Sequence, residues 1–231
     1  MTTPSIEEIR RKNPIKTFCD PFVYIPTYVG LYVVRLLYPT KITPNQVSFV
    51  SYLLYVVASL FIAINHYFIL ALVFLQIVIV LDGVDGRLAR TKNQTSLKGK
   101  FYEHITHETC PPLLFFALGS YLYLSLNNVI YLYLGSFIVI SRLIINSFGA
   151  AKEMIALRSN KEAKDSRILE HKNRIVHIII LQIITISNIP FAIWMVTLGY
   201  IFNYLGYVLM FYTIYFSGVM LLKVYRELIS S

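Results

Sequence analysis

Long apolar stretches, separated by short polar segments, run through most of this sequence. The longest stretches lie at about 45–64, 68–90, 100–124, 129–150, 174–195 and 200–222. Each is close to the roughly 20 residues that an α-helix needs to cross the hydrocarbon core of a bilayer. With 56% hydrophobic and only 14% charged residues, the chain has too little polar composition for a soluble domain of this length. The pattern therefore predicts an all-α integral membrane protein with six transmembrane helices.

The segment before the first of these stretches differs from a span. Residues 22–38 are apolar, but Pro21 precedes them and Pro26, Gly30 and Arg35 interrupt them. We expect an N-terminal amphipathic helix that lies in the membrane interface, with Arg35 and Lys41 reaching the lipid head groups. The chain is thus divided into an N-terminal lead with this interfacial helix, residues 1–40, and a six-helix domain, residues 41–231.

The first span has a recognisable start. Thr43 suits an N-cap, and Pro44 suits the first helical position. Asn45 and Ser48 follow within the first turns of the same helix. Their polarity is explained equally well by capping and by a role near a substrate.

The positive charges gather on one side of the predicted membrane. The formal net charge is +9, yet the predicted turns at 65–67, 125–128 and 196–199 contain no Lys or Arg. The other connections and both ends of the chain are basic. By the positive-inside rule, both termini and the end of the second span lie at the cytoplasmic face. Nucleic acid is not an expected partner, because these charges flank spans and do not form one solvated patch.

Acidic residues in the second and third spans are the strongest functional signal. Asp82 and Asp85 end the second apolar stretch, and Glu103 lies early in the third. Burying a charge in hydrocarbon is costly, so acids at these positions are candidates for function. Helical spacing gives each set one common face. The second-span face holds Asp82, Asp85, Gly86 and Ala89, and the third-span stripe holds Gly99, Glu103 and His107.

Carboxylates that meet in one polar hole of a bilayer repel one another unless a cation joins them. Mg²⁺ and Mn²⁺ prefer such oxygen ligands together with substrate phosphates. A pair of these ions bridges a pyrophosphate and supports in-line displacement at phosphorus. Arg90 follows the same stretch and adds positive charge where a leaving phosphate develops negative charge. We therefore expect Mg²⁺ or Mn²⁺ as cofactor, with two ions in the site.

The order of these residues resembles a known signature. Asp82-x-x-Asp85-Gly86-x-x-Ala89-Arg90, followed after eight residues by Gly99-x-x-x-Glu103-x-x-x-His107, is similar to the signature of the CDP-alcohol phosphatidyltransferases. The start Ile42-Thr43-Pro44-Asn45-Gln46 also resembles that family's first span. The resemblance is sharp over about 41–108 and only architectural elsewhere.

The resemblance implies a role for each matching position. Metal ligands fall at Asp82, Asp85, Glu103 and His107, and the CDP moiety is held by Gly86, Ala89, Arg90 and Gly99. In the family reaction, a hydroxyl acceptor attacks the phosphorus distal to cytidine and releases CMP. The implied partners are a CDP-alcohol donor, a hydroxyl-bearing acceptor, the lipid bilayer and a second copy in a homodimer.

The sequence departs from this signature at its last two acidic positions, where the family has Asp. Glu103 keeps the charge on a longer arm. His107 is the larger change, because an imidazole suits a general base near neutral pH better than a carboxylate does. It is also a poorer Mg²⁺ ligand. We therefore expect His107 to be the general base, with the second ion held more weakly, shared with Glu108, or replaced by Mn²⁺.

Two basic residues and two prolines complete the list of candidates. Arg142 and Lys152 suit a phosphorylated acceptor, although an arginine that snorkels to the interface explains Arg142 equally well. Pro111 and Pro112 remove helix hydrogen bonds to the carbonyls of His107 and Glu108, which predicts a kink in the third span.

Other interpretations stay open at this point. The donor is either CDP-diacylglycerol with a soluble acceptor, or a CDP-linked polar head group that is passed to a lipid or glycan hydroxyl. A small membrane cation transporter explains the acids but not Gly86, Ala89, Arg90 and Gly99 at their spacing. A catalytically inactive homologue is the third possibility, given the two substituted signature positions.

Overall fold

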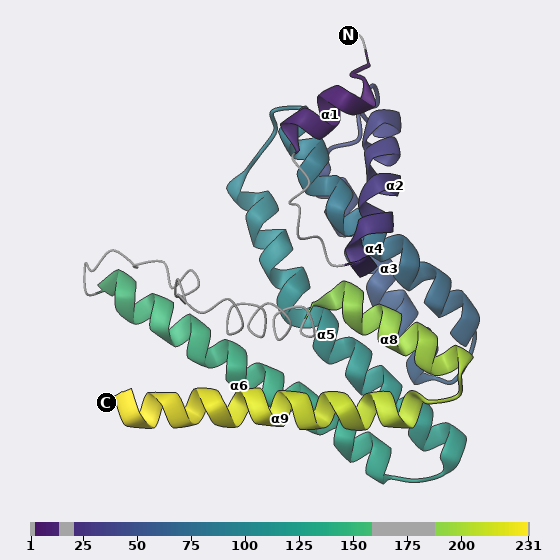
Figure 1. The fold of residues 1–231 in the computed structure, drawn as a ribbon, viewed down its shortest axis with the longest axis vertical. Coiled ribbons are helices and arrows are strands. Elements are labelled where there is room, and N and C mark those ends of the chain that lie inside the picture. Colours follow the sequence, from purple (N-terminus) through teal and green to yellow (C-terminus); the bar gives the residue numbers. More distant parts are fainter. Residues whose placement is uncertain (1–2, 14–20, 159–187, 231) are drawn as a thin grey trace.

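The protein folds entirely into helices within the part that the structure describes. A computed structural model describes residues 3–13, 21–158 and 188–230 (Figure 1). The helices are α1 (Ile6–Lys12), α2 (Pro21–Leu37), α3 (Pro44–Ala63), α4 (Phe68–Thr91), α5 (Leu97–Leu126), α6 (Ile130–Arg158), α8 (Ile189–Ile201) and α9 (Leu205–Ser230). The all-α prediction is confirmed for these residues.

Five of the described helices, α3, α4, α5, α6 and α9, are long and apolar enough to cross a membrane. They correspond to the first four predicted spans and to the last one. Most of the predicted span 174–195 lies outside the described residues. Its described end belongs to α8, which has 13 residues. The described residues therefore account for five of the six expected spans.

The turn expected at 196–199 is wrong. These residues lie inside α8, and the chain turns instead at 202–204. Asn203 adopts a left-handed backbone conformation there, with φ 61°. Asparagine tolerates this conformation better than most residues do, which suits it to the turn.

Two residues of the expected turn, Thr197 and Gly199, are accommodated within α8. The Thr197 hydroxyl donates a hydrogen bond to the Ile193 carbonyl one turn earlier, with 2.8 Å between the oxygens. Gly199 is small because α9 passes close by: a Cβ there would lie 2.8 Å from Cγ2 of Val208. A polar residue and a glycine thus serve helix packing at this position instead of ending the helix.

α3 and α5 begin at well-formed caps. Thr43 caps α3 through a reciprocal pair of hydrogen bonds with Gln46, and Pro44 occupies the first turn, as the sequence predicts. Ser96 caps α5, where its hydroxyl accepts the Gly99 amide at 3.1 Å. Because capping satisfies backbone amides that have no intrahelical partner, these caps fix both helix starts.

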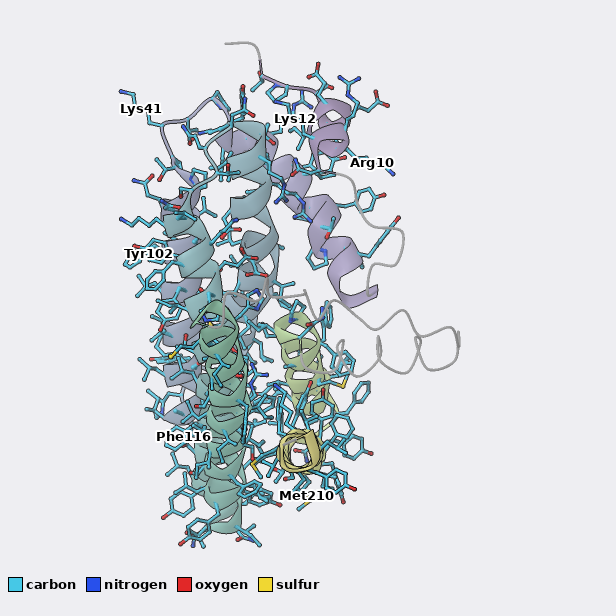
Figure 2. The ribbon with its side chains drawn as sticks, turned by 90° about the vertical axis from the view of Figure 1, so that its left-hand side faces the viewer. Arg10, Lys12, Lys41, Tyr102, Phe116 and Met210 are labelled. Atoms are coloured by element: carbon cyan, nitrogen blue, oxygen red, sulfur yellow. The ribbon has the colours of Figure 1, made fainter. Side chains whose placement is uncertain are left out.

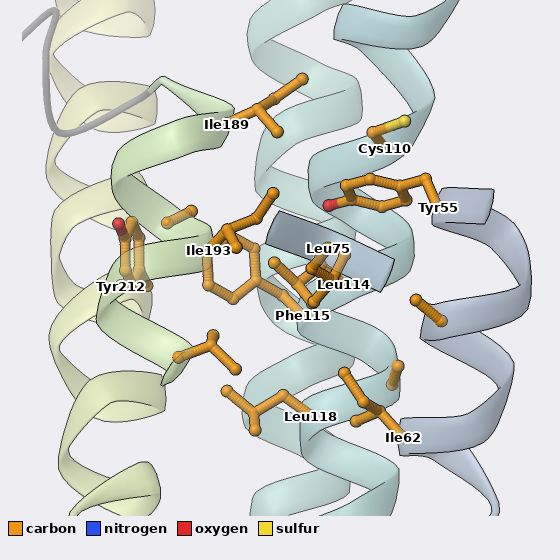
Figure 3. Close-up of a cluster of buried hydrophobic side chains, with 14 of the residues drawn as sticks. Tyr55, Ile62, Leu75, Cys110, Leu114, Phe115, Leu118, Ile189, Ile193 and Tyr212 are labelled. Carbon is orange, nitrogen blue, oxygen red and sulfur yellow. The ribbon is translucent and has the colours of Figure 1, made fainter. Parts of the chain in front are cut away.

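One apolar core joins helices from both halves of the chain (Figure 3). Tyr55 of α3, Leu75 of α4, Phe115 of α5, Ile193 of α8 and Tyr212 of α9 are each at most 1% exposed. The rings of Phe115 and Tyr212 lie 4.5 Å apart between centroids. This shared core holds α8 and α9 against the helices that carry the signature.

α5 and α6 approach each other closely at a pair of glycines. A Cβ on Gly119 would lie 2.7 Å from the Tyr131 carbonyl oxygen, and a Cβ on Gly135 would lie 2.8 Å from the Phe115 carbonyl oxygen. Both distances are shorter than a Cβ tolerates, and the obstructing atoms belong to backbone. The close contact between these two helices therefore depends on the absence of side chains at both positions.

α1 and α2 pack against the end of α4 (Figure 1). Ile9 of α1 and Leu31 and Val34 of α2 share a buried cluster with Val84 and Leu88 of α4. The lead segment is thus joined to the six-helix domain by an apolar contact of its own. The placement of α2 in the membrane interface stays a prediction.

Basic side chains gather at one end of the molecule. Figure 2 shows Arg10, Lys12 and Lys41 at the same end, whereas Phe116 and Met210 lie toward the other. The C-terminal end of α4 lies at this basic end (Figure 1). The predicted signature residues thus lie near the end of the bundle where positive charge is concentrated.

Candidate active site

A cavity of about 160 Å³ lies between the start of α3, the end of α4 and the start of α5. Its lining residues are Pro44, Asn45 and Ser48 of α3, Asp85, Gly86, Ala89 and Arg90 of α4, the connecting residues Gln94, Thr95 and Ser96, and Gly99, Lys100 and Glu103 of α5. All four residues assigned to the CDP moiety are among them, as are two of the assigned metal ligands. Residues far apart in the signature therefore meet around one space.

The helical repeat explains why α4 presents these residues together. Val84 and Leu88 are fully buried against α1 and α2. Asp85, Gly86 and Ala89 fall on a different face, which borders the cavity. Small residues at two of these positions leave the backbone of α4 accessible from the cavity.

Asp85 is held in place by hydrogen bonds to both of its carboxylate oxygens. The Ser48 hydroxyl donates to Oδ2 at 2.5 Å, and the Gly86 amide donates to Oδ1 at 2.6 Å. Ser48 is itself buried on α3. From the sequence, Ser48 could serve either in capping or near the substrate. In the structure it lines the cavity and donates a hydrogen bond to a predicted metal ligand.

Gly99 lets α5 approach α3 at the edge of the cavity. A Cβ at this position would lie 3.3 Å from Oδ1 of Asn45 and 3.4 Å from Oγ of Ser96. These contacts are tight without being prohibitive, so the glycine keeps this part of the wall open. Asn45 joins Ser48 as a second α3 residue that lines the cavity.

Asp82 and His107 are not among the residues that line the cavity. Asp82 lies about one turn deeper on α4 and within electrostatic range of both Glu103 and His107. No group of three or more His, Cys, Asp and Glu side chains lies close enough to hold a metal ion among the described residues. The described side chains therefore do not form a completed metal site, although the four assigned ligands share one region of the bundle.

The two arginines of the signature stretch have different surroundings. Arg87 donates to the Gly83 carbonyl at 2.7 Å and to the Thr27 hydroxyl of α2 at 3.1 Å. Arg90 lines the cavity, and its Nε donates to Oδ1 of Asn13 at 2.6 Å. Arg87 thus ties α4 to α2, whereas Arg90 is the arginine available to a ligand in the cavity.

Comparison with known protein families gives a match over most of the chain. The family described as CDP-alcohol phosphatidyltransferase matches residues 41–217. The chain belongs to this family. The match covers α3 to α8 and about half of α9, and it begins after α1 and α2. A search of the curated proteins finds no match.

Membership in the CDP-alcohol phosphatidyltransferase family supports a membrane transferase that uses a CDP-alcohol. The apolar helices support a protein embedded in the bilayer. The family match confirms the resemblance that the sequence carries at positions 82–107. The roles of the individual site residues stay predictions.

Arg142 of α6 reaches the backbone of α5 at the expected proline gap. Pro111 has no amide hydrogen, so the His107 carbonyl has no partner within the helix. Nη2 of Arg142 donates to this carbonyl at 3.4 Å, and its guanidinium lies 5.3 Å from the ring centre of Phe216. Its Nε is buried and has no hydrogen-bond partner among the described residues. Arg142 is therefore next to the backbone of the predicted base.

The other proposed acceptor residue, Lys152, lies in the last turns of α6. Its side chain is outside the described part of the structure. Sequence reasoning gave no role to Gln94 and Thr95, which follow α4 and line the cavity. The sequence signal that could have identified them is their position directly between the two halves of the signature.

A larger cavity, of about 340 Å³, lies at another place in the bundle. Tyrosines from α5, α6, α8 and α9 line it, together with apolar residues, Ser125 and Asn203. No acidic or basic side chain is among its lining residues. Its composition suits tyrosines at a membrane interface and gives no support for chemistry at a diphosphate.

Proposed function

We propose that the cavity between α3, α4 and α5 binds a CDP-alcohol, and that the protein transfers its phosphoalcohol group to a hydroxyl acceptor. The observation that carries this proposal is the meeting of the four donor-binding positions with Asp85 and Glu103 around one cavity. The family of the chain supports the same donor. The alternative function, cation transport, does not explain why small and basic residues line this cavity.

Divalent metal is assigned to Asp82, Asp85 and Glu103, with His107 at the fourth ligand position. The donor set fits a hard cation, because Asp85 and Glu103 present carboxylates to the cavity. Asp82 is within electrostatic range of Glu103, and a bound cation would relieve the repulsion between the two carboxylates. When bound, two Mg²⁺ or Mn²⁺ ions supply positive charge to the diphosphate oxygens.

The proposed reaction replaces one phosphoester linkage with another. The acceptor hydroxyl oxygen attacks the phosphorus that carries the alcohol, and a new phosphorus–oxygen bond forms. The bond from this phosphorus to the oxygen bridging to CMP breaks, and its electron pair leaves with CMP. Arg90, which lines the cavity, is the proposed group that stabilises the negative charge on that leaving group.

His107 is the proposed general base, which takes the proton of the acceptor hydroxyl. It lies one helical turn beyond Glu103 on α5, in electrostatic range of Asp82. A neutral imidazole nitrogen accepts a proton readily near neutral pH. Asp82, Asp85 and Glu103 would then remain as the carboxylate ligands of the ions.

Arg142 and Lys152 are the proposed acceptor-binding residues, which favours an acceptor that carries a phosphate group. Arg142 supports this assignment through its place beside the His107 backbone. The charge pattern supports an active site and both termini at the cytoplasmic face. A homodimer is proposed on the resemblance to the family alone.

The test is CMP release by the purified protein in nanodiscs. CDP-diacylglycerol and CDP-linked polar alcohols are each offered with soluble and lipid hydroxyl acceptors, in the presence of Mg²⁺ or Mn²⁺. We expect release with at least one pair, and loss of release with EDTA or in Asp85→Asn. A folded protein that releases no CMP with any pair would favour the inactive homologue and contradict the proposal.

A further inference from the structure

The short helix α1 lies against the end of α4 that carries the signature. Ile9 is fully buried in the cluster formed with α2 and α4. Nζ of Lys12 donates to the Thr91 carbonyl at 3.4 Å, at the last residue of α4. Figure 2 shows Lys12 and Arg10 at the same end of the molecule. An element outside the matched range 41–217 thus contacts the candidate site region.

Asn13, the residue directly after α1, connects this helix to the candidate site region. It is only 5% exposed. Its side-chain amide nitrogen donates to the Ile9 carbonyl at 2.9 Å and to Oγ1 of Thr91 at 3.4 Å. Its side-chain oxygen accepts Nε of Arg90 at 2.6 Å. Since an arginine only donates hydrogen bonds, this contact fixes which end of the amide faces it.

The remaining donors of Arg90 lie over the cavity. A Cβ built on Gly86 would lie 3.5 Å from Nη1 and 3.7 Å from Nη2 of Arg90. Both Gly86 and Arg90 line the cavity. Asn13 therefore engages the inner nitrogen of the guanidinium and leaves the outer nitrogens on the cavity side. The planar, forked guanidinium binds phosphate well when it is held in one orientation.

We propose that Asn13 is a positioning residue for Arg90, so that α1 completes the site that binds the donor diphosphate. This inference rests on the proposed function. Without the Asn13 oxygen, the long side chain of Arg90 has more freedom, and its outer nitrogens spend less time at the cavity. The effect is expected on donor binding and not on the proton transfer at the acceptor.

Asn13→Ala tests the role of the side-chain oxygen. We expect the KM for the CDP-alcohol and the Kd for CDP, measured by calorimetry, to rise about tenfold, as for loss of one hydrogen bond to a charged group. The KM for the acceptor should stay unchanged. A matched control is Lys12→Ala, which removes the other polar contact of α1 with Thr91 but leaves Asn13 and Arg90 in place. It should keep the wild-type KM and Kd.

Asn13→Asp separates positioning from a purely structural role. The carboxylate keeps an acceptor for Arg90 but loses the donor to the Ile9 carbonyl and to Oγ1 of Thr91. Under the proposal, Asn13→Asp keeps donor affinity within about threefold of wild type, since the bond to Arg90 remains. A purely structural role predicts that Asn13→Asp is as impaired as Asn13→Ala, and that result would overturn the inference.

A double-mutant cycle with Arg90→Ala measures the coupling between Asn13 and Arg90 even if Asn13→Ala disturbs the packing of α1. Under the proposal, adding Asn13→Ala to Arg90→Ala changes the Kd for CDP no further, because the two residues act through one group. Additive losses would overturn the inference. The proposed function itself fails only if wild type releases no CMP. Wild-type CMP release together with an unchanged Kd in Asn13→Ala overturns the positioning role alone.

Discussion

Ser48 of α3 and Asp85 of α4 are joined by a hydrogen bond of 2.5 Å between Oγ and Oδ2. The second oxygen of Asp85 accepts the Gly86 amide at 2.6 Å. The carboxylate is therefore oriented by two helices before any ligand arrives. Orientation of this kind by surrounding groups is what a metal ligand needs to keep its geometry.

Replacing Ser48 with alanine removes the contact from α3 and leaves Asp85 in place. Loss of a partner that orients a metal ligand typically reduces metal affinity or activity by about 10- to 100-fold. We expect a fall of about tenfold in kcat/KM and a higher Mn²⁺ concentration for half-maximal CMP release. Ser51→Ala is the control, because Ser51 is buried on the same helix but does not line the cavity. Equal activity of Ser48→Ala and wild type at limiting metal would contradict the role of this bond.

His107→Ala tests the proposed base. Loss of a general base typically slows turnover by about 10²- to 10⁴-fold, and we expect kcat to fall within that range. At saturating Mn²⁺, which offsets the loss of the weak fourth ligand, the Kd for CDP measured by calorimetry should stay close to wild type. Full turnover in the alanine variant with metal binding retained would remove His107 from the reaction. His104→Ala, on a neighbouring face of α5, is the matched control and should retain activity.

Arg142→Gln tests the acceptor site. Hydrogen bonds to charged groups contribute about 1.5–3 kcal/mol, so we expect the KM for a phosphorylated acceptor to rise by about tenfold or more. The KM for the CDP-alcohol should not change. An unchanged acceptor KM with a lower kcat would instead assign Arg142 to supporting the His107 carbonyl beside Pro111.

Gly119→Ala tests the contact between α5 and α6. The added Cβ would lie 2.7 Å from the Tyr131 carbonyl oxygen, which belongs to backbone. Overpacking of this kind costs about 1–3 kcal/mol, so we expect a lower melting temperature in detergent. Gly149→Ala is the control, since apart from its chain neighbours and the nearby backbone of α6 no described atom lies within 4 Å of its Cβ. Helix propensity favours that alanine by roughly 0.5–1 kcal/mol, so a lower melting temperature for Gly149→Ala than for Gly119→Ala would contradict the account.

Much of the site could be predicted because its residues lie on two adjacent helices at helical spacing. Thr43 and Pro44 predict the start of α3, and the spacing of Asp85, Gly86 and Ala89 predicts their common face. These features depend only on neighbours within three or four residues. Helix capping and helical spacing are therefore enough to predict them from the sequence.

Other features depend on contacts between distant parts of the chain. Nothing near Asn13 indicates that it binds Arg90, which is 77 positions away. The turn expected at 196–199 is helical instead, and the small size of Gly199 is explained only by its contact with Val208, which forms once α8 and α9 pack. Ser48 was ambiguous for the same reason, since its partner Asp85 lies on another helix.

The central claim is that the cavity between α3, α4 and α5 holds the cytidine diphosphate of the donor. The most direct measurement is an experimental structure of the protein with a CDP-alcohol and Mn²⁺, with the ions located by anomalous scattering. The account predicts the diphosphate against Gly86, Arg90 and Gly99, with Mn²⁺ bound by Asp82, Asp85 and Glu103. A nucleotide bound elsewhere, with the three acidic side chains directed away from it and from any ion, would contradict the account.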